Sequence, residues 1–484
     1  MSTAQQSTTQ DKAPLMLSVS GLRGVVGASL TPEVVVRYVC AAAAWMASEA
    51  NKAAPTVIVA RDGRASGAMV RELVIGALVA SGCEVIDLGI ATTPTTGVMV
   101  LEHGAQGAII ITASHNPQQW NGLKLLTAQG HAPGAQEAAQ VIEAFHAGEA
   151  RLAAHDRLIE SDYDDAADLT HVDRVLEAVA EVVPLDAIRH RKFRVLVDSV
   201  NASGAVPARM LLESLGCEET LINDNSDPAQ AGIFPHAPEP TAEHLKDLAS
   251  RAAAGAFDVA FAQDPDADRL AILDERGAYI GEEYTLALGA WAVLESMSDA
   301  ERTRSVLAAN LSTSRMIDDV AGWYGARVER TAVGEANLVE RMFAIESPIG
   351  GEGNGGVVWP RVVPIRDSVS AMALTLALMA RTGESVSQLV ARIPRYAMIK
   401  EKLEIKPGMA DRALQATREL FAGEAGARVT DTDGVRVDLA APDGGQQWIH
   451  VRASNTEPIL RLIAEAPTRE LAQGLIERVR VALG

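Results

Sequence analysis

The chain of 484 residues is long enough for about three or four domains, since a domain commonly holds about 150 residues. Its hydrophobic fraction of 48% supplies several cores and excludes disorder over most of the length. A total of 63 acidic residues against 43 Lys and Arg gives a formal net charge of −20, which disfavours nucleic acid and anionic membranes as partners. An anionic small molecule is not excluded, because clustered Lys and Arg can override the net charge inside a cleft.

Targeting signals are missing from the sequence pattern. No apolar run reaches the roughly 18 residues of a transmembrane helix. The N-terminal residues also lack the basic and then apolar order of a signal peptide. We therefore expect a cytoplasmic protein with no membrane partner.

Strand and helix patterns alternate along most of the chain. Residues 57–60 form a short β-branched run, residues 67–78 have helical spacing, and residues 84–88 return to a strand pattern. This alternation predicts parallel βαβ units, whose functional residues usually lie at the carboxyl ends of the strands. The same unit recurs, with further strands expected at 195–198 and 306–309.

The recurrence predicts the domain organisation. Ala-Ser-Gly-Ala occurs at 65–68 and again at 202–205, in step with the strand and helix patterns, which favours internal duplication. Near residue 395 the pattern changes to strands with helices segregated at the two ends, as in a small α+β domain. We therefore predict an α/β protein of three related mixed α/β domains and a C-terminal α+β domain. The expected boundaries are 13–165, 170–282, 283–390 and 395–484.

The first motif, Thr-Ala-Ser-His-Asn-Pro at 112–117, directly follows the strand expected at 107–111. Ser114 therefore lies at the carboxyl edge of a sheet, where it could act as a nucleophile or a phosphate carrier. His115 is not assumed to be a triad base, because nothing resembles Gly-x-Ser-x-Gly. Lys124 could return to the same edge. An Asn-Pro turn with a capping serine is the alternative, and this segment alone favours it.

The second motif places three carboxylates, Asp264, Asp266 and Asp268, on one side of an extended chain. Like charges this close repel unless a cation neutralises them, and oxygen ligands select a hard ion such as Mg²⁺ or Ca²⁺. An EF-hand is excluded, because Arg269 stands where that loop needs glycine and strand-like segments flank it. A solvated acidic turn is the alternative, although the flanking apolar runs favour a metal loop.

The third motif, Gly-Gly-Glu-Gly-Asn-Gly-Gly at 350–356, has five glycines that allow close backbone approach to a ligand. Glu352 and Asn354 are its only side chains, and both can accept hydrogen bonds from sugar hydroxyls or an amine. A nucleotide fingerprint is excluded, because the P-loop lysine and the Rossmann spacing are both absent. A flexible surface loop is the alternative.

The fourth motif lies at 452–458, between two expected strands, and contains Arg452, Ser454, Asn455 and Thr456. An arginine, two hydroxyls, an amide and exposed backbone N–H groups can form a phosphate cradle. A polar turn explains this segment equally well.

Together with Gly-Leu-Arg-Gly at 21–24, the four motifs occur in an order, one per expected domain, that resembles the α-D-phosphohexomutase superfamily over nearly the whole chain. The resemblance implies three related α/β domains and a fourth α+β domain around a central cleft. It also implies an intramolecular phosphotransferase of the isomerase class, which interconverts hexose 6-phosphate and hexose 1-phosphate through a phosphoserine enzyme and a bisphosphate intermediate.

The resemblance assigns the catalytic and metal-binding roles. It implies that Ser114 is phosphorylated in the working enzyme, and that its phosphoryl oxygen joins the three aspartates around one Mg²⁺ per chain. A hexose 1,6-bisphosphate is the implied activator. The implied metal ligands are Ser114, Asp264, Asp266 and Asp268. The implied catalytic residues are Ser114, Arg23, Lys124 and His115, with Arg23 and Lys124 at positions proposed for proton transfer or transition-state contacts.

The resemblance also assigns the substrate contacts. Glu352 and Asn354 are implied to bind sugar hydroxyls, and Arg269 lies beside the metal loop. The implied clamp on the non-reacting phosphate is Arg452, Ser454, Asn455 and Thr456. Arg23, Lys124, Arg269 and Arg452 are therefore expected to make a positive cleft in a negative protein.

The sugar loop departs from many relatives, which end it with Ser-Gly-His where this chain has Asn354 and Gly356. This form resembles archaeal-type phosphoglucosamine mutases, so we expect glucosamine phosphates as substrates. The alternative substrates are those of a phosphomannomutase/phosphoglucomutase. From other classes, the alternatives are a metal-dependent sugar phosphatase and a non-catalytic binding protein. The expected partners are a phosphosugar and at most a second copy of the chain, as a monomer or homodimer.

Overall fold

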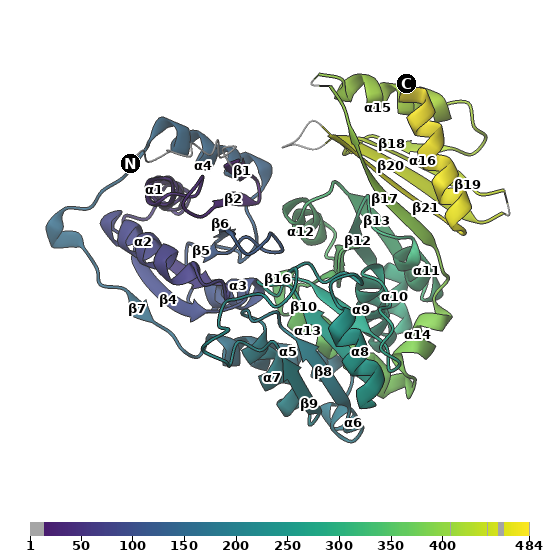
Figure 1. Ribbon diagram of the computed structural model, residues 1–484, viewed down its shortest axis with the longest axis horizontal. Helices are drawn as coiled ribbons and strands as arrows, with labels where there is room; N and C mark the ends of the chain where they lie inside the picture. Colours follow the sequence, from purple (N-terminus) through teal and green to yellow (C-terminus); the bar gives the residue numbers. More distant parts are fainter. Residues whose placement is uncertain (1–13, 407, 443, 454–458, 484) are drawn as a thin grey trace, which may run out of the picture.

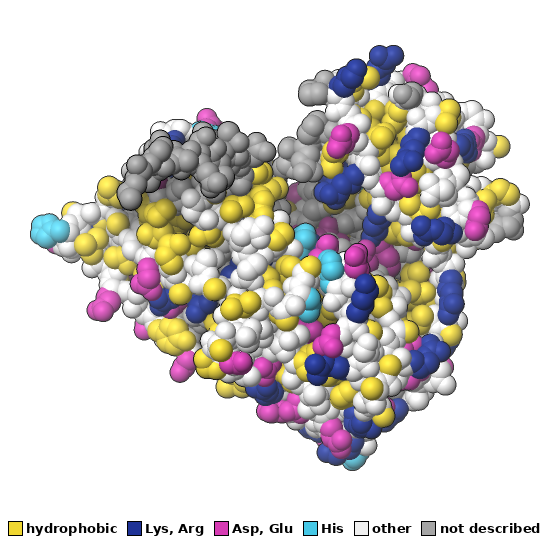
Figure 2. All heavy atoms as spheres, in the orientation of Figure 1, with side chains coloured by type: hydrophobic (Ala, Val, Ile, Leu, Met, Phe, Trp, Pro, Cys, Tyr) yellow, Lys and Arg dark blue, Asp and Glu magenta, His cyan; other side chains and the backbone are white. Residues whose placement is uncertain are grey.

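The computed structural model describes residues 14–406, 408–442, 444–453 and 459–483. Four sheets follow one another along these residues, and the predicted class of three mixed α/β domains with a C-terminal α+β domain is confirmed. The lobes that contain the first and fourth sheets lie on the left and at the upper right of Figure 1, with the second and third sheets below them. Figure 2 shows the same surface hollowed between these two lobes. No described helix is long and apolar enough to cross a membrane.

The first sheet has the strand order β1-β2-β6-β5-β3-β4-β7. β3 pairs in parallel with both β4 and β5, as the alternating pattern predicted, whereas β6 returns antiparallel to β5. Its strands are β1 (Met16–Ser18), β2 (Gly21–Val25), β3 (Thr56–Arg61), β4 (Glu84–Ile90), β5 (Gly107–Ile111), β6 (Trp120–Thr127) and β7 (Asp162–Tyr163). Its helices are α1 (Pro32–Glu49), α2 (Gly67–Ala80), α3 (Thr93–Glu102) and α4 (Ala135–Ala147).

The second sheet has the order β11-β10-β8-β9, in which only the edge strand β11 is antiparallel to its neighbour. The loop between β10 and β11 carries the three aspartates, so strands flank them as predicted. The strands are β8 (Arg194–Asp198), β9 (Glu218–Ile222), β10 (Val259–Gln263) and β11 (Leu270–Leu273). The helices are α5 (Ala167–Val182), α6 (Leu185–Arg189), α7 (Ala205–Ser214) and α8 (Lys246–Gly255).

The third sheet has the order β13-β12-β14-β15-β16. β14 and β15 form an antiparallel hairpin that contains the glycine-rich motif. The strands are β12 (Val306–Asn310), β13 (Arg327–Thr331), β14 (Gly350–Glu352), β15 (Gly356–Trp359) and β16 (Val363–Arg366). The helices are α9 (Glu283–Ser296), α10 (Asp299–Arg304), α11 (Met316–Trp323), α12 (Glu335–Ala344), α13 (Ser368–Thr382) and α14 (Val386–Arg392).

The fourth sheet is antiparallel throughout, with the order β17-β21-β20-β19-β18, and carries two helices. The last helix begins after Thr468, whose Oγ1 caps it by accepting a hydrogen bond from the N–H of Leu471 at 3.3 Å. The strands are β17 (Ala397–Glu404), β18 (Arg428–Thr430), β19 (Val435–Ala440), β20 (Gln446–Ala453) and β21 (Ile459–Ala466). The helices are α15 (Ala410–Phe421) and α16 (Arg469–Leu483).

The hydrophobic core divides unequally between the sheets. One cluster runs through the first three domains, from Ile58 through Phe261 and Trp291 to Ile393. Helices α9 and α13 are apolar on most faces, and they are buried inside this shared core. The fourth sheet has a separate cluster, which includes Phe421 and Ile449. The first three domains therefore pack as one body, and the fourth joins it mainly through polar contacts.

His450 on β20 makes one of these polar contacts. Its Nδ1 lies 2.9 Å from Oγ of Ser312, and its Nε2 lies 2.6 Å from the backbone oxygen of Asp433. Because a carbonyl oxygen only accepts, Nε2 carries the hydrogen and Nδ1 accepts from the Ser312 hydroxyl. Burial, aided by the positive charges of Arg436 and Arg452, lowers the pKa of His450 to about 4. The folded protein therefore holds this imidazole neutral.

Acidification is expected to destabilise the protein through His450. An unfolded histidine has a pKa near 6.5, so stability is present above that pH and is lost as the pH falls toward the folded pKa. Between about pH 7 and about pH 5 this linkage amounts to about 2 kcal/mol. Urea unfolding at both pH values should show that His450→Gln loses less stability than the wild type on acidification. The exposed His146, replaced in the same way, is the control, and equal losses in all three proteins would contradict the assignment.

Candidate active site

Ser114 lies in the loop that follows β5, and it is 3% exposed. Its φ of +47° falls in the left-handed region that residues other than glycine rarely adopt. Oγ1 of Thr112 accepts the Ser114 N–H at 2.8 Å, and Oγ of Ser114 donates to Oδ2 of Asp264 at 3.0 Å. The loop thus holds the Ser114 hydroxyl against the first of the three aspartates, which belongs to another domain.

A buried ion pair that the motifs did not predict supports this loop. Arg64 donates hydrogen bonds of 2.5–2.9 Å to four backbone carbonyls between residues 114 and 120. Its Nε lies 3.1 Å from Oδ2 of Asp62, which also accepts the Thr112 hydroxyl at 2.7 Å. Both members of the pair are fully buried. Asp62 and Arg64 follow β3, the parallel neighbour of β5, so their place at the carboxyl end of a strand was the available signal.

The three aspartates of the β10–β11 loop are fully buried, and one carboxylate oxygen from each lies within 4.8 Å of the others. Burial raises the pKa of Asp264 well above its ordinary value, and the carboxylates of Asp268 and Asp266 raise it further. Oδ1 of Asp266 and Oδ1 of Asp268 are buried without a hydrogen-bond partner. A compact set of carboxylate oxygens with unsatisfied acceptors fits a hard divalent cation such as Mg²⁺.

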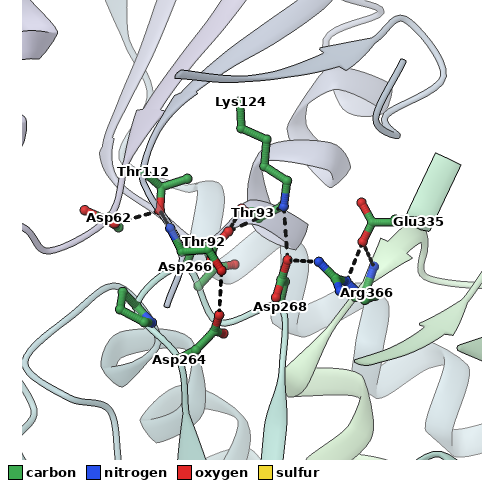
Figure 3. A network of polar contacts seen from close by, with 12 residues as sticks. Asp62, Thr92, Thr93, Thr112, Lys124, Asp264, Asp266, Asp268, Glu335 and Arg366 are labelled. Carbon is green, nitrogen blue, oxygen red and sulfur yellow. Dashed lines mark hydrogen bonds and ion pairs between the residues drawn. The ribbon is translucent and has the colours of Figure 1, made fainter. Parts of the chain in front are cut away.

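Two buried cations hold the third aspartate. Nζ of Lys124 lies 3.0 Å and Nη2 of Arg366 lies 2.6 Å from the same oxygen, Oδ2 of Asp268 (Figure 3). Burial would raise the pKa of Asp268, but Arg366 and Lys124 outweigh it and lower that pKa. Burial would likewise lower the pKa of Lys124, but Asp268 and Asp266 outweigh it and raise that pKa. Asp268 is therefore anionic and Lys124 protonated in this arrangement.

Helix α3 of the first domain also contacts the aspartates. Its first residue, Thr93, donates its hydroxyl to Oδ2 of Asp266 at 2.7 Å and its N–H to the Asp266 carbonyl at 2.9 Å. Thr92 caps this helix, and Pro94 stands in its first turn. None of the four motifs includes Thr93, although Thr-Thr-Pro is a helix-start signal.

The structure also brings Arg23, His115 and Arg269 to this site. Nη1 of Arg23 donates to the side-chain oxygen of Asn116 at 3.0 Å, and Nε of Arg269 lies 3.8 Å from Oδ1 of Asp268. Nδ1 of His115 lies 3.3 Å from Oγ of Ser114. Burial, together with the charges of Arg269 and Arg23, lowers the pKa of His115 to about 2, so the imidazole stays neutral.

Glu352 and Asn354 lie in the β14–β15 hairpin. Glu352 is buried, with Oε1 accepting from Nδ2 of Asn310 and Oε2 accepting from Nη1 of Arg366, both at 2.7 Å. Oδ1 of Asn354 is buried without a hydrogen-bond partner. Arg366 therefore connects the β14–β15 hairpin to the β10–β11 loop through Asp268.

The glycines of this hairpin serve a purpose that the sequence did not indicate. A Cβ at Gly353 would lie 1.8 Å from Oε2 of Glu283, and a Cβ at Gly356 would lie 2.2 Å from Cδ of Arg366. Both glycines make room for side chains of the protein itself, whereas the sequence suggested close approach of a ligand to the backbone.

Arg452 has a different set of contacts. It lies on β20, and its Nε is 3.3 Å from Oδ2 of Asp433. Among the described residues no contact joins Arg452 to the aspartates, so of the four cations expected to converge only Arg23, Lys124 and Arg269 lie together. Ser454, Asn455 and Thr456 lie outside the described residues.

Mg²⁺ is expected to stabilise the folded protein, because it would neutralise three buried carboxylates. At a concentration about 100 times its dissociation constant, a ligand adds about 2.7 kcal/mol to the free energy of unfolding. Thermal unfolding with and without excess Mg²⁺ should therefore show a rise in the wild-type midpoint, and Asp266→Asn should lose most of it. Asp247→Asn, at an exposed carboxylate of α8, should keep it. A wild-type unfolding midpoint that does not change on addition of Mg²⁺ would contradict a metal site at these aspartates.

Four domain families match the chain. They are described as phosphoglucomutase/phosphomannomutase, alpha/beta/alpha domain I at residues 16–152, domain II at 172–277, domain III at 282–396, and the C-terminal domain at 398–482.

Individual relatives match over almost their full length. The phosphoglucomutase/phosphomannomutase of Thermococcus kodakarensis is 35% identical over 459 residues, which cover 94% of this chain and 96% of the relative. The probable phosphoglucosamine mutase of Methanopyrus kandleri is 34% identical over 457 residues, covering 94% and 95%. The crystal structure of a phosphoglucomutase/phosphomannomutase family protein from Burkholderia thailandensis has the same fold, with a TM-score of 0.78 at 23% identity over 97% and 98% of the two chains.

Proposed function

The chain belongs to the phosphoglucomutase/phosphomannomutase family and is a phosphohexomutase, an isomerase, and on that premise we propose that it interconverts glucosamine 6-phosphate and glucosamine 1-phosphate. One observation carries the assignment of its site. Oγ of Ser114 lies 3.0 Å from Oδ2 of Asp264, so a nucleophilic hydroxyl meets a cation-binding triplet at the strand ends of two domains.

In the proposed reaction Ser114 carries the phosphoryl group. The bond between Oγ and phosphorus breaks as a sugar hydroxyl oxygen bonds to phosphorus, and the hydroxyl proton leaves to a basic group at the site. The resulting hexose 1,6-bisphosphate reorients and returns its other phosphoryl group to Ser114. The same bisphosphate, added from solution, would phosphorylate an empty Ser114 and so act as the activator.

The residues around Ser114 have separate proposed roles. Asp264, Asp266 and Asp268 would hold Mg²⁺, which would offset negative charge on the transferring group. Lys124 is protonated between two aspartates and Arg23 is permanently charged, so both suit transition-state stabilisation. Closure of the fourth domain would exclude water and protect the phosphoserine from hydrolysis.

Two buried carboxylates support glucosamine as the substrate. Glu335 and Glu352 both contact Arg366 beside the sugar loop, and Oε1 of Glu335 is buried without a hydrogen-bond partner. A 2-ammonium group would pair with such an acceptor better than a neutral hydroxyl would. The relative from Methanopyrus kandleri also bears the name of a phosphoglucosamine mutase. The second candidate is a phosphomannomutase/phosphoglucomutase, which the relative from Thermococcus kodakarensis favours.

A rate comparison tests the substrate. The pure protein, with Mg²⁺ and a hexose 1,6-bisphosphate, is given glucosamine, glucose and mannose 1-phosphates in parallel. The expected result is the highest kcat/KM for glucosamine 1-phosphate. A higher value for either neutral sugar would reassign the substrate, and isomerisation of none would overturn the proposal. Inorganic phosphate released faster than isomerised product would indicate a phosphatase, for which the relatives give no support.

The remaining proposals concern partners and location. We propose a phosphosugar as the small-molecule partner, a cytoplasmic location, and a monomer or homodimer. Light scattering on the purified chain distinguishes the two oligomeric states.

A further inference from the structure

Arg366 is the point where three segments of the site meet. It is the last residue of β16 and 9% exposed. Its Nη2 lies 2.6 Å from Oδ2 of Asp268 in the metal loop, and its Nη1 lies 2.7 Å from Oε2 of Glu352 in the sugar loop. Its Nε lies 2.7 Å from Oε2 of Glu335, the first residue of α12. One guanidinium therefore serves three carboxylates that come from three separate segments.

These contacts determine which oxygen of Asp268 is available to a metal ion. Lys124 and Arg366 both occupy Oδ2, while Oδ1 accepts no hydrogen bond. Two cations on one oxygen fix the rotation of the carboxylate and leave the other oxygen available for a metal ion. A lysine could not take over this role, because its single ammonium group lacks the planar fork that reaches several carboxylates at once.

Gly356 is shaped to fit Arg366. A Cβ at Gly356 would lie 2.2 Å from Cδ and 3.0 Å from Cγ of Arg366, so any side chain at this position would displace the arginine stem. Arg366 thus fills the space at the position where the loop departs from the Ser-Gly-His ending. The small residue and the large one form a matched pair across the β15–β16 hairpin.

We propose that Arg366 is a positioning residue, which locks Asp268 for metal binding and Glu352 for sugar binding in one geometry. The proposal rests on the proposed roles of this site in the mutase reaction. The proposal predicts that metal binding and sugar binding are coupled. A change at Arg366 should alter the metal affinity and the sugar kinetics together, although Arg366 itself is not proposed to contact the metal or the sugar. If the ion pairs of Arg366 served stability alone, a change at Arg366 would shift the unfolding midpoint but leave the Mg²⁺ affinity and the kinetic constants for the sugar unchanged.

The first test is Arg366→Lys, which keeps the positive charge and removes the fork. Calorimetric titration of the full chain with Mg²⁺ alone should show affinity lower by about 10-fold to 100-fold, the usual effect of losing a residue that orients a metal ligand. With the preferred sugar 1-phosphate at saturating Mg²⁺, KM should rise and kcat should fall. Wild-type metal affinity and kinetics in a folded Arg366→Lys protein would overturn the proposal.

The second test, Gly356→Ala, displaces Arg366 without removing it. It should lower Mg²⁺ affinity and raise KM in the same direction as Arg366→Lys. Gly322→Ala is the matched control, because a Cβ there meets no atom within 4 Å. A Gly356→Ala protein with wild-type Mg²⁺ affinity would overturn the proposal even if turnover fell. If the wild type isomerised no sugar, the proposed function would fail, while the Mg²⁺ titrations would still decide the role of Arg366.

Discussion

Replacing Ser114 with alanine is expected to reduce turnover by on the order of 1000-fold or more, because the variant has no oxygen to carry the phosphoryl group. The fold should persist, since the Thr112 and Arg64 contacts to this loop use the backbone of residue 114. The measurement is isomerisation of the preferred sugar 1-phosphate with Mg²⁺ and hexose 1,6-bisphosphate, beside the thermal unfolding midpoint. The midpoint should change by only a few degrees.

A mass measurement separates the carrier role from a merely positional one. After incubation with hexose 1,6-bisphosphate, the wild type should gain the mass of one phosphoryl group and Ser114→Ala should gain none. Ser250→Ala, at an exposed serine of α8, should match the wild type in mass gain and turnover. An active Ser114→Ala protein, or one that still takes up a phosphoryl group, would remove Ser114 from the proposed reaction.

Replacing Arg64 with methionine is expected to lower the free energy of unfolding by about 3–5 kcal/mol, the cost of leaving one member of a buried ion pair without its partner. Methionine fills much of the same space, so the loss is mainly electrostatic. Asp62 would become an uncompensated buried carboxylate, and four carbonyls of the Ser114 loop would lose their donor. Denaturant unfolding measures the loss, and turnover should fall as the loop loosens.

The chain contains a matched control for this prediction. Asp274 and Arg276 have the same spacing and also form an ion pair, but the Arg276 side chain is 69% exposed. Arg276→Met should therefore cost much less than Arg64→Met, because water can replace an exposed guanidinium. The double variant Asp62→Asn with Arg64→Met should recover part of the loss, because it removes the buried charge. Equal losses at Arg64 and Arg276 would show that burial does not set the cost.

Sequence reasoning predicted the parts of the site that lie in short motifs. Ser114 and the three aspartates each follow an apolar strand directly, which placed them at the carboxyl ends of strands. They belong to two different sheets, and only the family resemblance implied that they meet at one site. The strands and helices were predicted for the same reason, since the hydrophobic period is a local property.

The roles of Thr93 and Arg366 could not be predicted, because their partners lie far away in the chain. Thr93 is 173 positions from Asp266, and Arg366 is 98 positions from Asp268. A lone threonine or arginine has no local pattern that separates it from an ordinary surface residue. The same holds for Gly356, which must lack a side chain only because Arg366 of the next strand fills that space.

The position of Arg366 in the chain has a consequence for biosynthesis. Synthesis proceeds from the N-terminus, so the Ser114 loop and the aspartates emerge long before residue 366, and until then Asp268 has only one of its two cations. The shared core of the first three domains also lacks α13 (Ser368–Thr382) up to that point. A nascent chain that ends before residue 366 therefore carries Ser114 and the aspartates without the complete set of contacts around them. Fragments that end before residue 366 should therefore have no mutase activity, so activity requires synthesis of the third domain at least through residue 366.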